Sequence, residues 1–286
     1  MKRFRNILVG VDLADGDRLV GDTLSAPSVQ AVEQALWLAR TSGAKVTLMY
    51  SLDVCARTQQ MILENGGRDN IHALARGVLE DLVHSALDQG VDATSRVEFG
   101  PPCTELIQAV RDGQFDLVVI GTKQHWVVSQ LLFGTTGLKL LRKCPCPVWV
   151  VKPNERREVT ELLVAHDLSP VGELALELGA SMSELYGAKL HVLHAVEPEA
   201  VADPPGEVRS AVVRSSIVEK LGDLHFAETT ALTVVESDPA EAIVRYVNDH
   251  DVELLVLGSN ARSGISGLIS GNLAEQLLPG IRCSVM

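Results

Sequence analysis

A carboxylate and a glycine-bounded loop occur together in the first half of this 286-residue chain, and phosphate-binding sites use both. Asp12 closes the apolar run NILVGVD, and Gly121 is followed after 13 residues by Gly134 and Thr135. A glycine-rich loop that leads into a helix offers backbone N–H groups and a favourable helix dipole to an anion. A carboxylate at the end of a strand can accept a hydrogen bond from a ribose or a base. These residues predict a mononucleotide pocket at the carboxyl edge of a parallel sheet.

The second half repeats this set with different side chains. Asp167 closes the run LLVAHD, and Gly258 is followed after 13 residues by Gly271 and Asn272. Tight turns use glycine for conformational reasons alone, so the glycines by themselves are weak evidence for a ligand. The repetition nevertheless predicts two versions of one site in a single chain.

Longer matches between the halves indicate one architecture built twice. GAKVTLMYS at residues 43–51 matches GAKLHVLHA at 187–195, and DLVVIGT at 116–122 matches ELLVLGS at 253–259. A short charged segment near residues 152–161 separates domain 1–153 from domain 154–286. Apolar runs that alternate with amphipathic segments predict an α/β fold with a five-stranded parallel sheet in each domain and helices on both faces.

The expected elements follow the same order in both domains. In the first, strands are expected at 6–12, 45–52, 93–99, 116–121 and 148–152, and helices at 28–41, 69–89, 102–111 and 135–142. In the second, strands are expected at 162–167, 189–195, 230–236 and 253–258, with a short or truncated last strand, and helices at 172–186, 208–221, 238–248 and 272–278.

Composition and charge exclude several classes of protein. The 46% apolar content argues against disorder, and no run approaches the roughly 18–20 apolar residues of a membrane span. Five cysteines without zinc spacing, and no recognisable signal peptide, favour a cytoplasmic location. The first domain has 16 basic and 16 acidic residues, so the net charge of −12 lies in the second, with 9 basic and 21 acidic residues. The acidic balance argues against a nucleic-acid partner of the second domain, and no nucleic-acid partner is expected. The favoured interpretation is that the negative charge only keeps the protein soluble.

No catalytic or metal-binding constellation is recognisable. The chain lacks a Walker A loop, a Gly-x-Ser-x-Gly elbow and a His-Glu-x-x-His motif. His191 and His194 fall on opposite faces of one strand, which argues against a shared metal. His166 could touch a ligand beside Asp167, but one such pair does not define an acid–base system. The pair in Cys144-Pro-Cys146 is expected to be buried or exposed without chemistry, because its spacing is not Cys-x-x-Cys.

On these residues the chain resembles a tandem universal stress protein, with two UspA-type domains in one polypeptide. The nucleotide-binding pattern of that family is Gly-x2-Gly-x9-Gly-Ser/Thr after the fourth strand, at the positions of Gly121 and Gly258. The segment LLRKCPCPVWVVK at 140–152 is similar to the family's Cys-Pro-x-Val strand, and GNLAEQ at 271–276 is similar to the two-domain UspE subgroup. The resemblance covers nearly the whole chain and implies two Rossmann-like domains of the adenine-nucleotide-hydrolase type.

Both domains depart from this pattern at its second glycine, which is Gln124 in one and Ala261 in the other. Where that residue needs a positive φ, a side chain costs about 1–2 kcal/mol, and affinity falls about tenfold for each 1.4 kcal/mol. Gln124 would also fill phosphate space, whereas Ala261 adds only a methyl group. Thr135 keeps the hydroxyl of the last position, and Asn272 offers an amide there. We therefore expect the second domain to be the better nucleotide site.

Four charged residues complete the expected sites. Lys123 and Arg262 could pair with phosphate, although solvated loop cations are the favoured reading. Asp12 and Asp167 are expected to face the ligand, as the resemblance implies.

Three functions stay open. The favoured one is a non-catalytic stress-response protein that binds an adenine nucleotide, such as ATP with Mg²⁺, weakly and in at most one domain. An ATP-hydrolysing enzyme would need a magnesium-binding carboxylate near the loop, and neither 121–134 nor 258–271 contains an acidic residue. A structural adaptor would have both pockets filled by side chains. The resemblance also implies an intramolecular pseudo-dimer formed by the last strands (147–152 and 283–286), or a homodimer of two chains.

Overall fold

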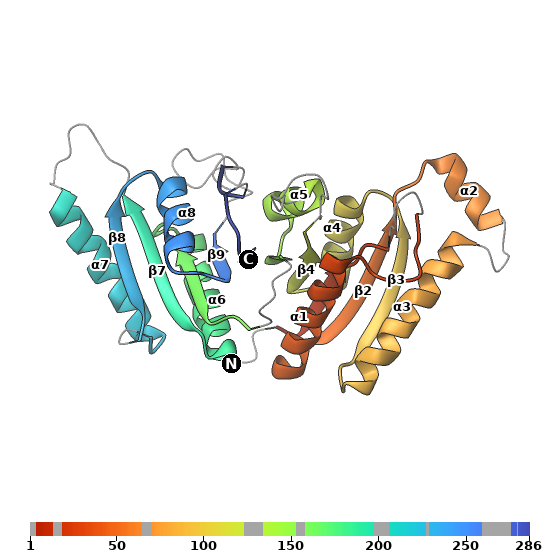
Figure 1. Ribbon diagram of the computed structural model, residues 1–286, viewed down its shortest axis with the longest axis horizontal. Helices are drawn as coiled ribbons and strands as arrows, with labels where there is room; N and C mark the ends of the chain where they lie inside the picture. Colours follow the sequence, from red (N-terminus) through yellow and green to blue (C-terminus); the bar gives the residue numbers. More distant parts are fainter. Residues whose placement is uncertain are drawn as a thin grey trace. The chain divides into compact units, whose positions relative to one another are not determined.

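The chain forms two compact units, Met1–Pro153 and Asn154–Met286. The computed structural model describes residues 4–13, 19–64, 70–122, 134–152, 158–196, 206–226, 229–258, 276–278 and 280–286 (Figure 1). In each unit the described strands form a parallel sheet with helices packed against it, so the predicted α/β class is confirmed.

The first unit contains a sheet in the order β3-β2-β1-β4-β5. Every neighbouring pair in this order is parallel. Its strands are β1 (Asn6–Gly10), β2 (Lys45–Leu52), β3 (Ala93–Phe99), β4 (Leu117–Gly121) and β5 (Val148–Val151). Its helices are α1 (Ala26–Ser42), α2 (Ala56–Glu64), α3 (Ile71–Asp88), α4 (Pro102–Gly113) and α5 (Thr135–Lys143).

The second unit repeats this order as β8-β7-β6-β9-β10. Its strands are β6 (Glu161–Ala165), β7 (Lys189–Val196), β8 (Ala231–Glu236), β9 (Leu254–Leu257) and β10 (Ser284–Val285). Its described helices are α6 (Pro170–Tyr186), α7 (Gly206–Asp223) and α8 (Pro239–Asp249). The two-residue β10 agrees with the short last strand that was expected. The helix expected at 272–278 lies mostly outside the described residues.

Helices cover both faces of each sheet. Successive side chains of a strand point to opposite faces, so neighbouring residues of one strand contact different helices. In β4, the Cα–Cβ direction of Gly121 points at Pro27 of α1, whereas Ile120 lies within reach of Leu106 of α4 and Gly137 of α5. The runs LVVI in β4 and LLV in β9 are therefore almost fully buried, as their continuous apolar sequence predicts.

One carboxylate ties the first and fourth strands together in each unit. Asp116, just before β4, accepts the backbone N–H groups of Arg5 and Asn6 at 2.7 and 3.1 Å. Glu253, just before β9, accepts those of Thr160 and Glu161, both at 2.8 Å. The repeats DLVVIGT and ELLVLGS begin with these two acids, so the internal match includes a shared device for strand pairing.

The structure corrects two expectations. Residues 56–64 were expected to be loop but form α2, which is rich in strong helix formers and buries only Ile62. The first strands end at Gly10 and Ala165, two residues before Asp12 and Asp167. In the first unit the reason is local, because the Asp12 N–H donates to the Ser28 hydroxyl and not to a neighbouring strand.

Candidate functional site

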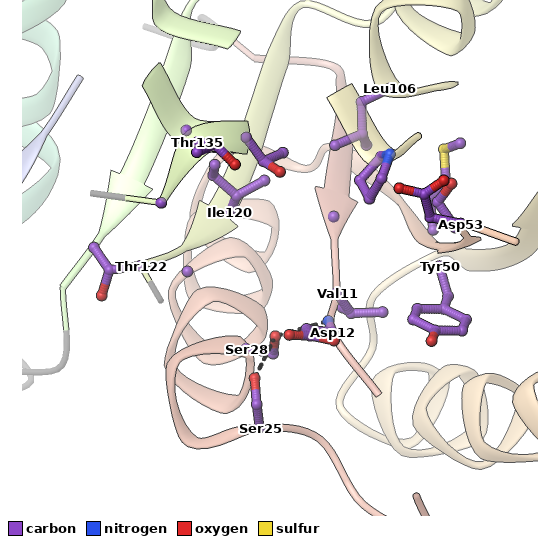
Figure 2. Close-up of a pocket in the computed structure, with 18 of the residues that line it drawn as sticks. Val11, Asp12, Ser25, Ser28, Tyr50, Asp53, Leu106, Ile120, Thr122 and Thr135 are labelled. Atoms are coloured by element: carbon purple, nitrogen blue, oxygen red, sulfur yellow. Dashed lines mark hydrogen bonds between the residues drawn. The ribbon is translucent and has the colours of Figure 1, made fainter. Parts of the chain in front are cut away.

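A pocket of about 340 Å³ lies in the first unit, beyond the carboxyl ends of β1, β2 and β4 and beside the start of α5 (Figure 2). Small-molecule sites usually span about 300–1,000 Å³, so this pocket is at the small end of that range. Its lining includes all four residues that the sequence predicted for this unit, which are Asp12, Gly121, Gly134 and Thr135.

The floor of the pocket is apolar and depends on one glycine. Gly10, the last residue of β1, lies beside Ile120 of β4 and Leu106 of α4. A Cβ at Gly10 would come within 2.9 Å of Ile120 Cγ2 and 3.0 Å of Leu106 Cδ1. Glycine at this position therefore allows the two apolar side chains to close the floor without displacing each other.

Gly121 has a packing role that its loop position does not reveal. A Cβ there would lie 2.4 Å from the carbonyl oxygen of Pro27, at the first turn of α1. In the second unit, Gly258 is in a similar position, because its Cβ would lie 3.0 Å from the carbonyl oxygen of Val171 in α6. Both glycines let a helix approach the end of the fourth strand closely.

The start of α5 forms the anion-binding side of the pocket. Gly134 is the N-cap residue, and it has no side chain to accept the first N–H groups of the helix. The first turn contains no acidic residue, and Thr135, Thr136 and Gly137 all line the pocket. No described side chain caps this helix start, and a helix N-terminus with its positive dipole end suits a phosphate or carboxylate group.

The start of α1 holds the backbone of Asp12 on the other side of the pocket (Figure 2). The Asp12 N–H donates to Ser28 Oγ at 2.9 Å, and Ser25 Oγ donates to the same oxygen at 3.0 Å. The Tyr50 hydroxyl lines the pocket and donates to the Leu19 carbonyl oxygen. Burial, and secondarily the charge of Asp12, raises the pKa of Tyr50 to about 12, so Tyr50 is a neutral donor at physiological pH.

Asp167, the counterpart of Asp12, is used differently in the second unit. Its Oδ1 accepts the Ser169 hydroxyl at 2.6 Å and the Ser169 N–H at 3.1 Å. Ser169 Oγ in turn accepts the Gly172 N–H at 3.0 Å and caps α6. A Cβ at Gly172 would lie 2.2 Å from Asp167 Oδ1, so a side chain at this position would displace the carboxylate. Asp167 therefore stabilises the start of α6.

Two histidines replace Val11 and Tyr50 at the carboxyl edge of the second unit. His166 is 5% exposed; its Nδ1 accepts the Leu168 N–H at 3.3 Å, and its Nε2 has no hydrogen-bond partner among the described residues. Burial is the main cause that lowers the pKa of His166, so its neutral form is favoured. His194 Nδ1 lies 2.7 Å from the His166 carbonyl oxygen. The described parts of the two sites therefore differ in chemistry.

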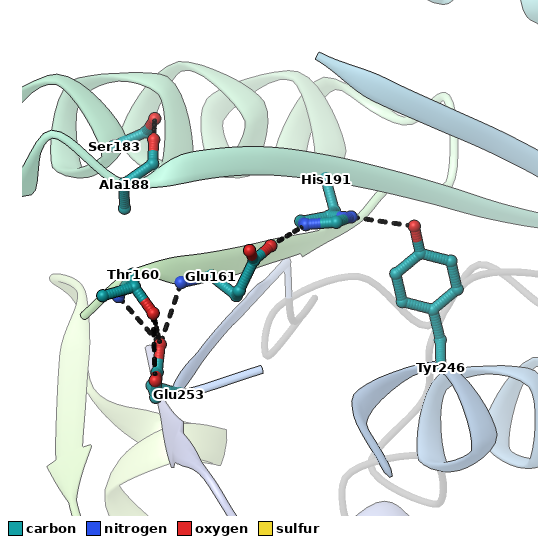
Figure 3. A network of polar contacts seen from close by, with 7 residues as sticks. All are labelled: Thr160, Glu161, Ser183, Ala188, His191, Tyr246 and Glu253. Carbon is teal, nitrogen blue, oxygen red and sulfur yellow. Dashed lines mark hydrogen bonds and ion pairs between the residues drawn. The ribbon is translucent and has the colours of Figure 1, made fainter. Parts of the chain in front are cut away.

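A second polar network lies at the amino edge of the same sheet (Figure 3). His191 is almost fully buried; its Nδ1 lies 2.9 Å from the Tyr246 hydroxyl, and its Nε2 contacts a carboxylate oxygen of Glu161. Burial lowers the pKa of His191, and the contact with Glu161 opposes this effect in part. The network joins β6, β7 and α8, which is a structural use for a histidine that the sequence left without a role.

Known proteins resemble this chain along its whole length. The model of the universal stress protein family matches residues 3–152 and again residues 159–286. The chain belongs to the universal stress protein family. Universal stress protein E of Photorhabdus laumondii is 23% identical over 309 residues, and the match covers 100% of this chain and 95% of that protein. Universal stress protein E of Escherichia coli K12 is 26% identical over 311 residues, covering 100% and 94%.

Solved structures of the family share the tandem fold. A universal stress protein from Archaeoglobus fulgidus has a TM-score of 0.72 at 18% identity, covering 98% of this chain and 96% of its own. A shorter family protein from Arabidopsis thaliana, solved with AMP bound, covers 53% of this chain with 20% identity and a TM-score of 0.39. The first likeness supports the fold alone, and the second is too low to support a conclusion about this chain.

Several predicted site residues of this universal stress protein fall outside the described residues. Gln124 and Ala261, at the second glycine position of the family pattern, are among them. So are the neighbouring cations, Lys123 and Arg262, and the end of the second loop, Gly271 and Asn272. Within the described ranges, no group of three or more His, Cys, Asp or Glu side chains is arranged to hold a metal ion. The same part of the chain contains no helix with the length and apolar character to cross a membrane.

Most lining residues of the first pocket were not predicted from the sequence, and Tyr50 and Asp53 are the two unpredicted ones with an ionisable side chain. Both lie at the carboxyl end of β2, which pairs directly with β1. The signal was available, because polar residues that end neighbouring parallel strands converge at one edge of the sheet. The residues predicted for the site all lie at or after the first and fourth strands. Asp53 adds a second carboxylate to the pocket. The magnesium-binding acid that ATP hydrolysis would need was expected near the glycine-bounded loops 121–134 and 258–271, and Asp53 lies outside both.

Proposed function

We propose that this universal stress protein binds one adenine mononucleotide, or a similarly sized phosphorylated ligand, in the pocket of its first unit and does not turn it over. The observation that carries the proposal is the uncapped start of α5, which opens into the same pocket as Asp12. An anion site and a hydrogen-bond acceptor within one small cavity match the two ends of a nucleotide.

Charge sets the orientation of the ligand. Asp12 and Asp53 line the side of the pocket that β1 and β2 form, and carboxylates there repel a phosphate. The phosphate therefore belongs at Thr135 and Thr136, where backbone N–H groups and the helix dipole favour negative charge. The ribose hydroxyls and the amino group of a base are donors, so they suit the carboxylate side.

We propose the first unit as the nucleotide-binding unit, although the sequence predicted that the second would be the better nucleotide site. The pocket of the first unit retains about 340 Å³, a volume that suits a mononucleotide better than a fully enclosed triphosphate. In the second unit the counterpart carboxylate, Asp167, already accepts two hydrogen bonds from Ser169. A carboxylate that stabilises its own helix is a poorer ligand contact, because binding would have to break those bonds.

ATP hydrolysis is the second candidate function, and Asp53 is the observation that favours it. Together with Asp12 it places two carboxylates in the pocket wall, where they could hold Mg²⁺ against a phosphate chain. Mg²⁺ would then engage both carboxylates, and the described lining residues include no histidine or lysine to act as a general base, so we rank slow or absent turnover first. A purely structural adaptor is third, because the described side chains that line the first pocket leave about 340 Å³ between them.

Calorimetry with adenosine, AMP and ATP, each with and without Mg²⁺, tests the proposal on the full chain. We expect AMP to bind at one site per chain. Thr136→Asp should weaken AMP binding at least about tenfold, because a carboxylate at the helix start repels phosphate, and should leave adenosine binding nearly unchanged. Asp12→Ala should weaken both ligands about tenfold through the lost hydrogen bond.

Asp167→Ala is the matched control in the second unit. It should lower thermal stability through the lost interactions at the start of α6, without changing AMP affinity. If Asp167→Ala abolishes AMP binding and Asp12→Ala does not, the ligand belongs to the second unit and the proposal is wrong. Phosphate release from ATP at a steady rate, lost in Asp53→Asn, would establish the enzyme instead.

We also propose that the two units pair with each other within one chain. Two similar units in tandem support an intramolecular pseudo-dimer, since a second chain is then unnecessary to bring two such units together. Sedimentation of the full chain should give the mass of a monomer, whereas a dimer mass would favour pairing between chains.

A further inference from the structure

The two cysteines after α5 form a close pair. Cys144 follows the last residue of the helix, and its N–H donates to the Leu140 carbonyl oxygen at 2.8 Å. The chain then bends at residues 145–146 before it enters β5. This bend places Cys144 Sγ 3.8 Å from Cys146 Sγ, with both residues partly exposed and neither in a disulfide.

We propose that Cys144 and Cys146 form a redox-active dithiol that closes to a disulfide by exchange with a small anionic disulfide. This role is independent of nucleotide binding. The sequence predicted no chemistry for the pair, because its spacing is not that of the familiar redox motif.

The geometry allows ring closure with a small movement. A disulfide needs its sulfur atoms about 2.05 Å apart, and the two thiols are already in contact. Rotation about the side-chain bonds of Cys144 and Cys146 can supply the remaining approach, because both residues lie in irregular backbone between a helix and a strand.

The surroundings make the two thiols unequal. The hydrogen bond from Cys146 lowers the pKa of Cys144, although burial opposes it. The same hydrogen bond, burial and the nearby charge of Asp116 raise the pKa of Cys146. Cys144 is therefore the attacking thiolate and Cys146 the thiol that resolves the mixed disulfide.

The exchange is balanced without any other reagent. The Cys144 thiolate attacks one sulfur of the small disulfide, forms a mixed disulfide and expels one thiolate. Cys146 then loses its proton to solvent and attacks Cys144 Sγ, and the second small thiolate leaves. The protein loses two electrons and two protons overall, and the small disulfide gains both electrons.

Charge favours an anionic partner. The last turn of α5 carries Arg142 and Lys143, directly before Cys144. Two adjacent cations attract a partner that carries carboxylates, of which oxidised glutathione is a practical probe.

The test uses the full chain, reduced and then equilibrated with graded ratios of reduced and oxidised glutathione. After an acid quench, free thiols are alkylated and peptides are mapped by mass spectrometry. We expect a Cys144–Cys146 disulfide, seen as the loss of two hydrogen atoms from one peptide. Cys146→Ser should accumulate a glutathione adduct on Cys144, and Cys144→Ser should form its adduct on Cys146 at least about tenfold more slowly.

Two further variants serve as controls. Cys55→Ser removes an exposed thiol and should leave the closure of the ring unchanged. Cys103→Ser tests the thiol whose pKa responds to the charge of Cys144, and it should also have no effect. A Cys103–Cys144 disulfide, stable glutathione adducts on Cys144 and Cys146 without ring closure, or no oxidation while Cys55 reacts would each overturn the proposal.

Discussion

Gly172 leaves the space that the carboxylate of Asp167 occupies, since a Cβ on this glycine would lie 2.2 Å from Asp167 Oδ1. Ser28 stands at the equivalent place in α1, and its hydroxyl accepts the Asp12 N–H instead. The residue at this place on the first turn of the helix therefore makes a different contact with the strand-end acid in each unit. In one unit the acid stabilises the helix start, and in the other it lines a pocket.

The first prediction concerns this space. Gly172→Ser should expel Asp167 from the start of α6 and destabilise the second unit by about 1–3 kcal/mol, because overpacking and the loss of two hydrogen bonds act together. Hydrogen exchange followed on peptides of each unit measures the effect, since two units need not unfold as one. Gly222→Ala in α7 is the control: its Cβ meets nothing within 4 Å, so it should stabilise by up to about 1 kcal/mol.

A second prediction separates packing from ligand binding at the end of β4. Gly121→Ala places a Cβ 2.4 Å from the Pro27 carbonyl oxygen and should cost about 1–3 kcal/mol of stability even without a ligand. Gly137→Ala is the matched variant in α5, where the nearest atom, Ile120 Cδ1, is at an ordinary 3.5 Å. Thermal melting without nucleotide compares the two. Equal melting temperatures would show that Gly121 is not needed for packing.

The third prediction is a pH dependence. Burial lowers the pKa of His166, so the unfolded chain binds this proton more tightly than the folded chain. The corresponding stability is complete above the ordinary histidine pKa of about 6.5 and is lost as the pH falls through the lowered value. His166→Val copies Val11 of the first unit and should make stability fall less steeply between about pH 7.5 and 5. His191, with a pKa lowered in the same direction, stays in both proteins. Parallel pH profiles would contradict this prediction.

The fourth prediction tests the carboxylates that join the first and fourth strands. Asp116→Ala and Glu253→Ala each remove the acceptor of two backbone N–H groups. Each should destabilise its own unit by about 1 kcal/mol, because these bonds lie partly in solvent. Peptide-resolved hydrogen exchange should show faster exchange at the start of β1 or of β6 only. Faster exchange in both units from a single substitution would mean that the effect is not local.

The sequence by itself determined the tandem α/β architecture. The matched segments and the buried runs of β4 and β9 were readable, because strand and helix periods are local properties of the chain. A glycine just after a predicted helix is a local stop signal as well, and Gly43 and Gly187 adopt φ of 73° and 65° after α1 and α6, which few other residues accept. α2 escaped detection because a largely exposed helix buries too little to leave a hydrophobic pattern.

Only the tertiary structure decided what each predicted residue does. Asp12 and Asp167 hold the same place in the repeated pattern, but Asp12 lines a pocket and Asp167 accepts hydrogen bonds from Ser169. Ser28 and Gly172, on the following helices, contact them differently. Tyr50 and Asp53 join the first pocket because β2 lies beside β1 in the sheet. Such relationships come from contacts between separate elements, and neither composition nor the spacing of a motif records them.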